Sequence, residues 1–136
     1  MKFNKLIYIL LALLCPILSI ADNYVIINQV LYDTSLGEGG GVQYGGNGEF
    51  VELYNAGTND VNLEGWQLKG GSPSEVWTFT AADNIPSQGF LLVACRRGAT
   101  NNFQLTDWYA GAVGRTVIYQ NKIMLNNEGE TIIFMC

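Results

Sequence analysis

Histidine is absent from this sequence of 136 residues. It is the most frequent general base, the partner of catalytic serine and cysteine nucleophiles, and a common ligand of catalytic zinc. Its absence excludes Ser-His-Asp and Cys-His catalysis and nearly all catalytic zinc sites. No other catalytic constellation stands out, so we expect a protein that is not an enzyme and needs no cofactor.

Basic residues are also scarce. Seven Lys and Arg residues face twelve Asp and Glu residues, which gives a formal net charge of −5. The only basic doublet is Arg96-Arg97. Affinity for nucleic acid comes mostly from Lys and Arg side chains that displace counterions from phosphates. Nucleic acid is therefore not an expected partner.

The longest hydrophobic run lies at the N-terminus. Lys2 and Lys5 precede an apolar run that begins at Leu6, and Ser19-Ile20-Ala21 supplies small residues at the two positions that signal peptidase recognises. We expect residues 1–21 to be a cleaved signal peptide. The rest of the chain is then exported to the periplasm, the cell surface or the extracellular space, with a net charge of −7 once Lys2 and Lys5 are removed.

Two other fates of the leader are less favoured. A membrane anchor is disfavoured because Pro16 interrupts the apolar run, which is shorter than the roughly 20 residues of a spanning helix. The run also lacks basic residues on its far side, which would stop its transfer. As a lipoprotein signal, Cys15 has Leu14 before it, where a small residue is wanted. We expect no membrane span after cleavage.

Short runs with an apolar residue at every second position fill residues 22–136, which suffice for one domain. No run holds a helical period over ten residues. Turn signals recur every eight to twelve residues, which predicts an all-β, antiparallel sandwich of about seven or eight strands. The expected strands are 24–32, 48–55, 61–68, 76–80, 90–95, 116–119, 123–125 and 131–136.

The alternation also predicts the interior of this sandwich. Trp66 is expected near its centre, because a buried Trp removes on the order of 200 Å² from water. The residues expected to line the inner face are Ile27, Val51, Leu53, Leu63, Trp66, Leu68, Leu92 and Ile133.

Two cysteines remain after cleavage, Cys95 and Cys136, each at the end of an apolar run. Export permits a disulfide, and one forms if the two strands are neighbours, with Cα atoms within about 7 Å. The alternative, which we favour, is a pair of buried thiols, since free cysteine is among the most buried residue types.

The strand sequences, taken together and in order, resemble the lamin tail domain family over nearly all of residues 22–136. This resemblance implies an immunoglobulin-like sandwich. It also implies a binding or spacer module, because exported bacterial members are often joined to secreted nucleases, phosphatases or other hydrolases. The segments that carry the resemblance are 30–33 (VLYD), 49–55 (EFVELYN), 61–68 (VNLEGWQL), 77–79 (WTF), 85–90 (IPSQGF) and 125–132 (LNNEGETI).

The chain departs from the family pattern in two places. The glycine-rich stretch between Asp33 and Glu49 is longer than the usual short link. The turn and further strand that normally follow the last strand are missing, which leaves a C-terminal truncation of the domain open.

Acidic residues around the glycine-rich stretch supply weak candidate sites. Asp33, Glu38 and Glu49 are oxygen ligands of the kind Ca²⁺ prefers, but no alternating Asp-x-Asp spacing supports a metal site. The stretch lacks the Lys-Ser/Thr ending of a phosphate-binding loop. Glu49 and Glu52 lie three apart in a strand, so they point to opposite faces and favour structural roles over acid–base chemistry.

Aromatic residues in expected loops form the last candidate site. Tyr44, Trp108, Tyr109 and Tyr119 are expected to supply a recognition surface for sugar rings or a protein; the alternative is that they plug the ends of the sandwich. We therefore expect an exported, non-catalytic binding or structural module that mediates protein or surface-glycan interactions. The alternative is an N-terminal accessory domain of a larger secreted hydrolase, of nuclease or phosphatase type, whose catalytic part is missing here.

The cleavage site gives the first testable prediction. Intact mass spectrometry of the exported protein should show a mature chain that begins at Asp22, because Ser19 and Ala21 fit the peptidase pocket. An exported chain that begins at Met1 or Cys15 would contradict it.

Overall fold

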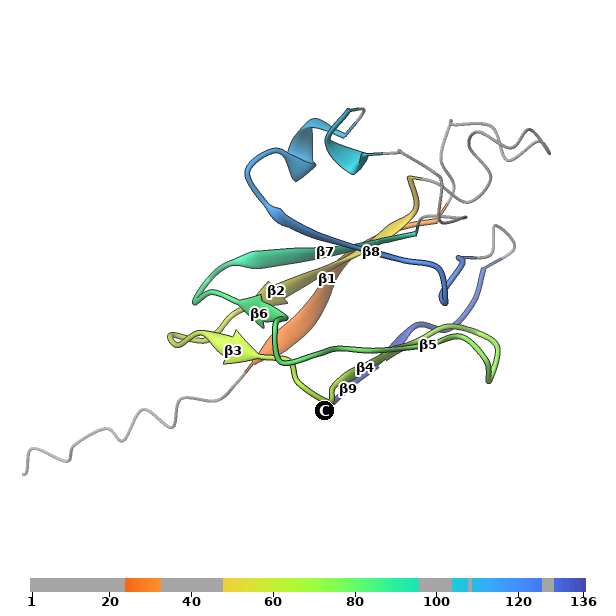
Figure 1. The fold of residues 1–136 in the computed structure, drawn as a ribbon, viewed down its shortest axis with the longest axis horizontal. Helices are drawn as coiled ribbons and strands as arrows, with labels where there is room; N and C mark the ends of the chain where they lie inside the picture. Colours follow the sequence, from red (N-terminus) through yellow and green to blue (C-terminus); the bar gives the residue numbers. More distant parts are fainter. Residues whose placement is uncertain (1–23, 33–47, 96–103, 108, 126–128) are drawn as a thin grey trace, which may run out of the picture.

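The computed structural model describes residues 24–32, 48–95, 104–107, 109–125 and 129–136. These residues form nine β-strands and two single-turn 3-10 helices, so the all-β prediction is confirmed (Figure 1). The elements are β1 (Val25–Leu31), β2 (Phe50–Asn55), β3 (Val61–Asn62), β4 (Gln67–Lys69), β5 (Val76–Thr78), β6 (Asn84–Ile85), β7 (Phe90–Cys95), η1 (Leu105–Asp107), η2 (Ala110–Ala112), β8 (Thr116–Gln120) and β9 (Ile133–Met135).

The larger sheet has the strand order β1-β2-β7-β8. β1 and β7 both pair with β2 in antiparallel fashion, whereas β8 runs parallel to β7. The expectation of a purely antiparallel sandwich is therefore wrong for this pair. A parallel pair needs a crossover of a dozen or more residues, and residues 96–115 between the two strands provide it.

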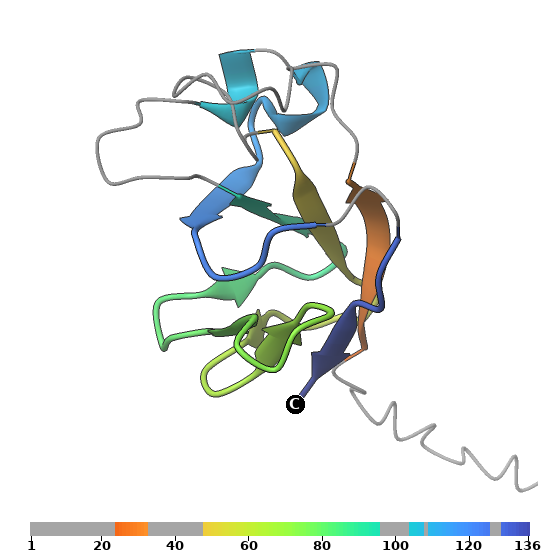
Figure 2. The same ribbon diagram turned by 90° about the vertical axis from the view of Figure 1, so that its right-hand side faces the viewer.

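The second layer consists of the sheet β5-β4-β9, with the short pair β3-β6 beside it. All of its pairings are antiparallel. Both views place this layer on one side of the four-stranded sheet and η1 and η2 on the other (Figures 1 and 2). We call the face toward β4 the inner face and the face toward η1 and η2 the outer face.

The expected strand 61–68 is two strands, β3 and β4, in different sheets. A turn separates them, in which the Trp66 amide donates to the Leu63 carbonyl at 2.9 Å. Gly65 has φ +80°, a left-handed conformation that glycine adopts without steric cost. The Glu64-Gly65 pair thus ends one strand and redirects the chain to the other sheet.

The inner core lies between the two layers. β2 and β7 contribute alternate residues to it, and Leu53, Leu68 and Leu91 are completely buried. Its buried members are Val51, Leu53, Val61, Leu63, Leu68, Phe79, Ile85, Leu91, Val93, Ile123 and Leu125, and Ile27 packs against them half-buried.

Three expected core residues lie elsewhere. Ile133 is 48% exposed, because alternation in β9 turns Phe134 inward instead. Trp66 is half-buried at the margin of the inner core, where its ring centroid lies 5.2 Å from that of Phe134. Leu92 is buried, but on the outer face.

A second core covers part of the outer face. Phe50, Leu92 and Ala94 pack there against Leu105 of η1 and Ala112 of η2. The two 3-10 helices therefore shield one end of the outer face from water, and β2 and β7 are buried on both sides.

Neither Cys95 nor Cys136 forms a disulfide. Cys95 is buried at the end of β7, while Cys136 follows β9 in the other sheet and is exposed. The two strands are not neighbours, so the bridge does not form, and the expectation that both thiols are buried is wrong for Cys136.

The core assignment predicts contrasting costs of truncation. Leu68→Ala should lower the free energy of unfolding by about 2–5 kcal/mol, since it removes a fully buried side chain and leaves a cavity. Ile133→Ala should lower it by less than about 1 kcal/mol, because that side chain is half in water. Urea denaturation measures both values, and equal losses would contradict the placement of β9.

Candidate functional site

Several of the sequence-based site residues fall outside the part of the chain that the structure describes. Among these are Asp33 and Glu38 of the calcium hypothesis, and Tyr44 and Trp108 of the aromatic surface. Glu49 lies within the described part. Over the described ranges, no group of three or more His, Cys, Asp or Glu side chains is placed to hold a metal ion.

Glu49 has a structural position just before β2. It is 4% exposed, and its Oε2 accepts a hydrogen bond of 3.0 Å from the Leu125 amide of the inner core. Gln120 helps to hold the same segment, since its Oε1 accepts from the amides of Lys122 and Ile123 at 2.7 and 2.8 Å. Residues 123–125 do not form the expected strand. Their amides at Ile123 and Leu125 donate to the side chains of Gln120 and Glu49 instead of to a neighbouring strand.

A cavity of about 10 Å³ lies between Glu49, Cys95, Gln120 and the inner core. That volume suits a single water molecule at most. This cavity therefore offers no room for a substrate. Glu52 lies on the opposite face of β2, so the two carboxylates cannot act together on one bond.

Tyr109 and Tyr119 are half-buried against the outer core. The Tyr109 ring centroid lies 4.8 Å from that of Phe50, and the Tyr119 hydroxyl accepts a hydrogen bond of 2.7 Å from the Leu105 amide. Both tyrosines thus hold the 3-10 helices on the sheet, which agrees with the plugging role rather than with a free aromatic surface.

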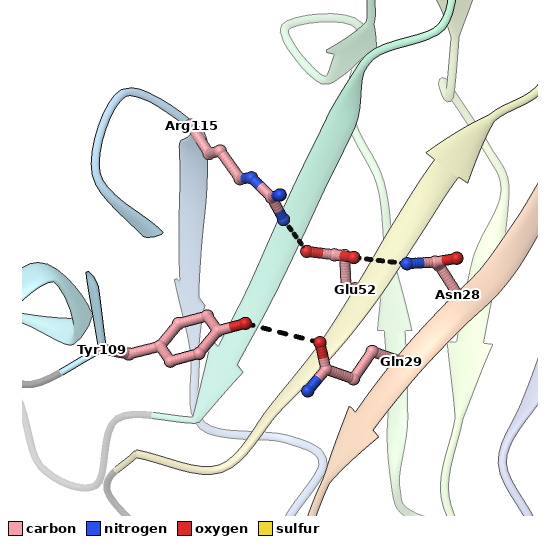
Figure 3. Close-up of polar contacts among 5 residues, drawn as sticks. All are labelled: Asn28, Gln29, Glu52, Tyr109 and Arg115. Carbon is pink, nitrogen blue, oxygen red and sulfur yellow. Dashed lines mark hydrogen bonds and ion pairs between the residues drawn. The ribbon is translucent and has the colours of Figure 1, made fainter. Parts of the chain in front are cut away.

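The rest of the outer face is not covered by the 3-10 helices, and polar side chains gather on it. Figure 3 shows Glu52 of β2 between Arg115, which precedes β8, and Asn28 of β1. Gln29 lies beside Asn28, and its Oε1 accepts a hydrogen bond of 3.4 Å from the Tyr109 hydroxyl. We call Asn28, Gln29, Glu52 and Arg115 the polar row.

A β-bulge in β1 brings the two amide side chains together. Ile27 pairs with Leu53 and Gln29 with Glu52, so Asn28 is the extra residue. Apolar residues 25 and 27 face inward before the bulge and Val30 faces inward after it. The bulge therefore keeps the apolar side chains inside and leaves both Asn28 and Gln29 exposed.

Glu52 is fully bonded within the polar row. It is 2% exposed, its Oε1 accepts from Asn28 Nδ2 at 2.6 Å, and its Oε2 forms an ion pair with Arg115 Nη1. A buried carboxylate needs such partners, because leaving it unpaired in a low-dielectric site costs several kcal/mol. Both carboxylate oxygens of Glu52 already bond to Asn28 or Arg115, which argues against a role as a general base.

Arg115 joins the polar row to aromatic side chains. Its guanidinium carbon lies 4.3 Å from the centroid of the Phe90 ring, a cation–π contact. The Phe90 ring in turn lies 4.8 Å from that of Tyr54 at an interplanar angle of 30°. Ile26, which is 37% exposed, pairs with Tyr54 in the neighbouring strand.

These apolar residues form a band across the outer face. Tyr24 is 61% exposed and lies two residues before Ile26, so it points to the same face. We call Tyr24, Ile26, Tyr54 and Phe90 the aromatic row. Sequence analysis missed it because only one apolar face was assigned to each strand. The signal was present, since runs 50–54 and 90–95 carry large apolar residues at both parities, which is typical of strands covered on both sides.

Two packed β-sheets and an interior built from alternating side chains define a β-sandwich module. The model of one family, the lamin tail domain, matches residues 19–135. The chain belongs to this family, whose domains are immunoglobulin-like and non-catalytic. No curated protein matches the sequence significantly. None of the helices in the described ranges has the length and apolar character needed to cross a membrane.

The Arg115–Glu52 pair can be tested by substitution. Arg115→Met should lower the free energy of unfolding by about 2–3 kcal/mol, because it leaves the buried Glu52 carboxylate with Asn28 as its remaining partner. The double variant Arg115→Met/Glu52→Gln should recover part of that loss.

The matched control is Lys122→Met, which removes a cation from an exposed residue. Its effect should stay within about 0.5 kcal/mol in the same urea titration. Strictly additive losses in the double variant would show that the two side chains do not interact.

Proposed function

We propose that this protein is an exported, non-catalytic binding module that attaches to a cell-surface component, either a glycan or a protein, through the open part of its outer face. The observation that carries the proposal is that the partly exposed aromatic row lies beside the accessible members of the polar row, Asn28, Gln29 and Arg115. Recognition surfaces combine half-exposed rings with a few fixed polar groups in this way.

The state of the carboxylates supports binding rather than catalysis. Glu49 and Glu52 lie on opposite faces of β2, and each is bonded to structural partners. General acid–base catalysis needs a carboxyl group that can reach a substrate proton. Glu49 and Glu52 are too deeply buried to reach a substrate proton.

An accessory role in a larger secreted hydrolase is the second candidate. The bonding of Glu49 and Glu52 to structural partners favours this role too. A module without an accessible catalytic carboxylate would depend on a separate catalytic domain to hydrolyse a substrate. The reading frame beyond Cys136 distinguishes the two. A continuing frame that encodes a nuclease-like or phosphatase-like domain supports the accessory role, and a stop codon supports an independent module.

Co-sedimentation with isolated cell envelopes tests the binding role. Purified residues 22–136 should pellet with envelopes of the source organism in a saturable manner, because the open face remains free in the isolated domain. Proteinase K treatment of the envelopes should abolish the interaction if the partner is a protein, and periodate oxidation should abolish it if the partner is a glycan.

The control is the variant Ile26→Ser/Gln29→Ala, which alters the open face without touching either core. It should lose pelleting while keeping its unfolding midpoint near that of the unaltered protein. Equal pelleting of both proteins, or none of either, would contradict the proposed function.

A further inference from the structure

We infer that the polar row and the aromatic row together form a binding site for a neutral oligosaccharide. This inference rests on the proposed binding function and narrows it to one ligand class and one set of residues. Three properties of the site carry it: its charge balance, its free hydrogen-bonding groups and the orientation of its rings.

The charge balance favours an uncharged ligand. Arg115 and Glu52 form an ion pair, so their charges cancel within the polar row. The other polar groups of the row, Asn28 and Gln29, are neutral amides. An anionic ligand would have to compete with Glu52 for the guanidinium and approach a protein of net charge −5. A cationic ligand would find a carboxylate that is 2% exposed and already bonded twice.

The free hydrogen-bonding groups match hydroxyl groups. Among the described residues, Asn28 Oδ1 and Gln29 Nε2 have no hydrogen-bond partner, and both side chains are exposed. Arg115 keeps further N–H groups beyond the one that binds Glu52, and its side chain is 32% exposed. A sugar hydroxyl both donates and accepts, so neighbouring hydroxyls can bond to the Asn28 acceptor and the Gln29 donor at once.

The polar groups are held in place before any ligand arrives. Asn28 is tethered to Glu52 at 2.6 Å and Gln29 to Tyr109 at 3.4 Å, and the bulge fixes the backbone between them (Figure 3). Side chains that are already ordered lose less conformational entropy when they bind.

The aromatic row provides the apolar part of the site. The Tyr54 and Phe90 rings are tilted by 30° relative to each other, and both are half-buried. Because the Arg115 guanidinium lies over Phe90, the partly exposed side of Tyr54 is the ring surface left for a ligand. The apolar C–H face of a sugar ring packs against such a surface, while its hydroxyls point outward to polar groups. Ile26 and Tyr24 extend the row along the strand direction of β1, which suits a chain of sugars rather than a single one.

Titration of the ¹⁵N-labelled domain, residues 22–136, tests this site directly. The probes are chitotetraose, cellotetraose and mannotetraose as neutral oligosaccharides, with tetragalacturonate as the anionic counterpart. At least one neutral probe should shift the side-chain amide signals of Asn28 and Gln29 in a saturable manner, while tetragalacturonate binds at least tenfold more weakly. This readout needs no variant and so does not depend on folding.

Gln29→Ala should weaken binding of the neutral probe about five- to tenfold, the loss expected for one neutral hydrogen bond. The matched control is Gln67→Ala, which removes the same side chain from β4 in the other sheet and should leave the affinity unchanged. Equal losses in both variants would overturn the inference.

The outcomes separate this inference from the proposed function. Three results would overturn the saccharide site. These are signal shifts confined to other residues, a preference for tetragalacturonate, and no binding of any neutral probe. If envelope pelleting persists in that case and is sensitive to proteinase K, the protein remains a binding module with a protein partner. If envelope pelleting is also absent, the proposed function fails together with the inference.

Discussion

The parallel pairing of β7 with β8 is the constraint on which the arrangement of the outer face depends. Because the two strands run in the same direction, the chain must return along the sheet before β8 can begin. The described part of that return contains η1 and η2, which cover Phe50, Leu92 and Ala94. Arg115 ends the connection above Phe90 and Glu52. The topology therefore determines which part of the outer face η1 and η2 cover and which part they leave uncovered.

Double-sided burial of β2 explains why its acidic residues are structural. Glu49 and Glu52 are nearly inaccessible to water, on opposite sides of the strand. Each carboxylate gives up hydration that only hydrogen bonds or an opposite charge can replace. Leu125 supplies an amide to the first, and Asn28 with Arg115 supplies an amide and a cation to the second. Glu52 and its two partners, which stabilise the sandwich in this way, also belong to the polar row of the outer face.

The strands marked by short apolar runs between turns were predictable, and the features set by distant contacts were not. Residues 50–55 and 90–95 form β2 and β7 within the predicted bounds, because both are short, largely apolar runs flanked by turn residues. The break at Gly65 was missed, although the alternation changes phase there, from Val61 and Leu63 to Trp66 and Leu68. The Arg115–Glu52 pair joins residues 63 apart in the chain, a separation for which no local pattern exists. Leu92 was placed on the wrong face because only one covered face was considered.

The bulge at Asn28 also relates the length of β1 to the faces on which its side chains lie. The residues before it and after it face the interior with opposite parity, so the extra residue reconciles two stretches that would otherwise be out of phase. Without the bulge, a strand of the same length would turn Val30 out toward solvent and Leu31 in toward the other sheet, whereas deletion of Asn28 itself would leave both side chains facing as they do. A relative that lacks the extra residue should accordingly have a regular β1 with the same inward-facing residues, while insertions or deletions elsewhere in β1 should be rare.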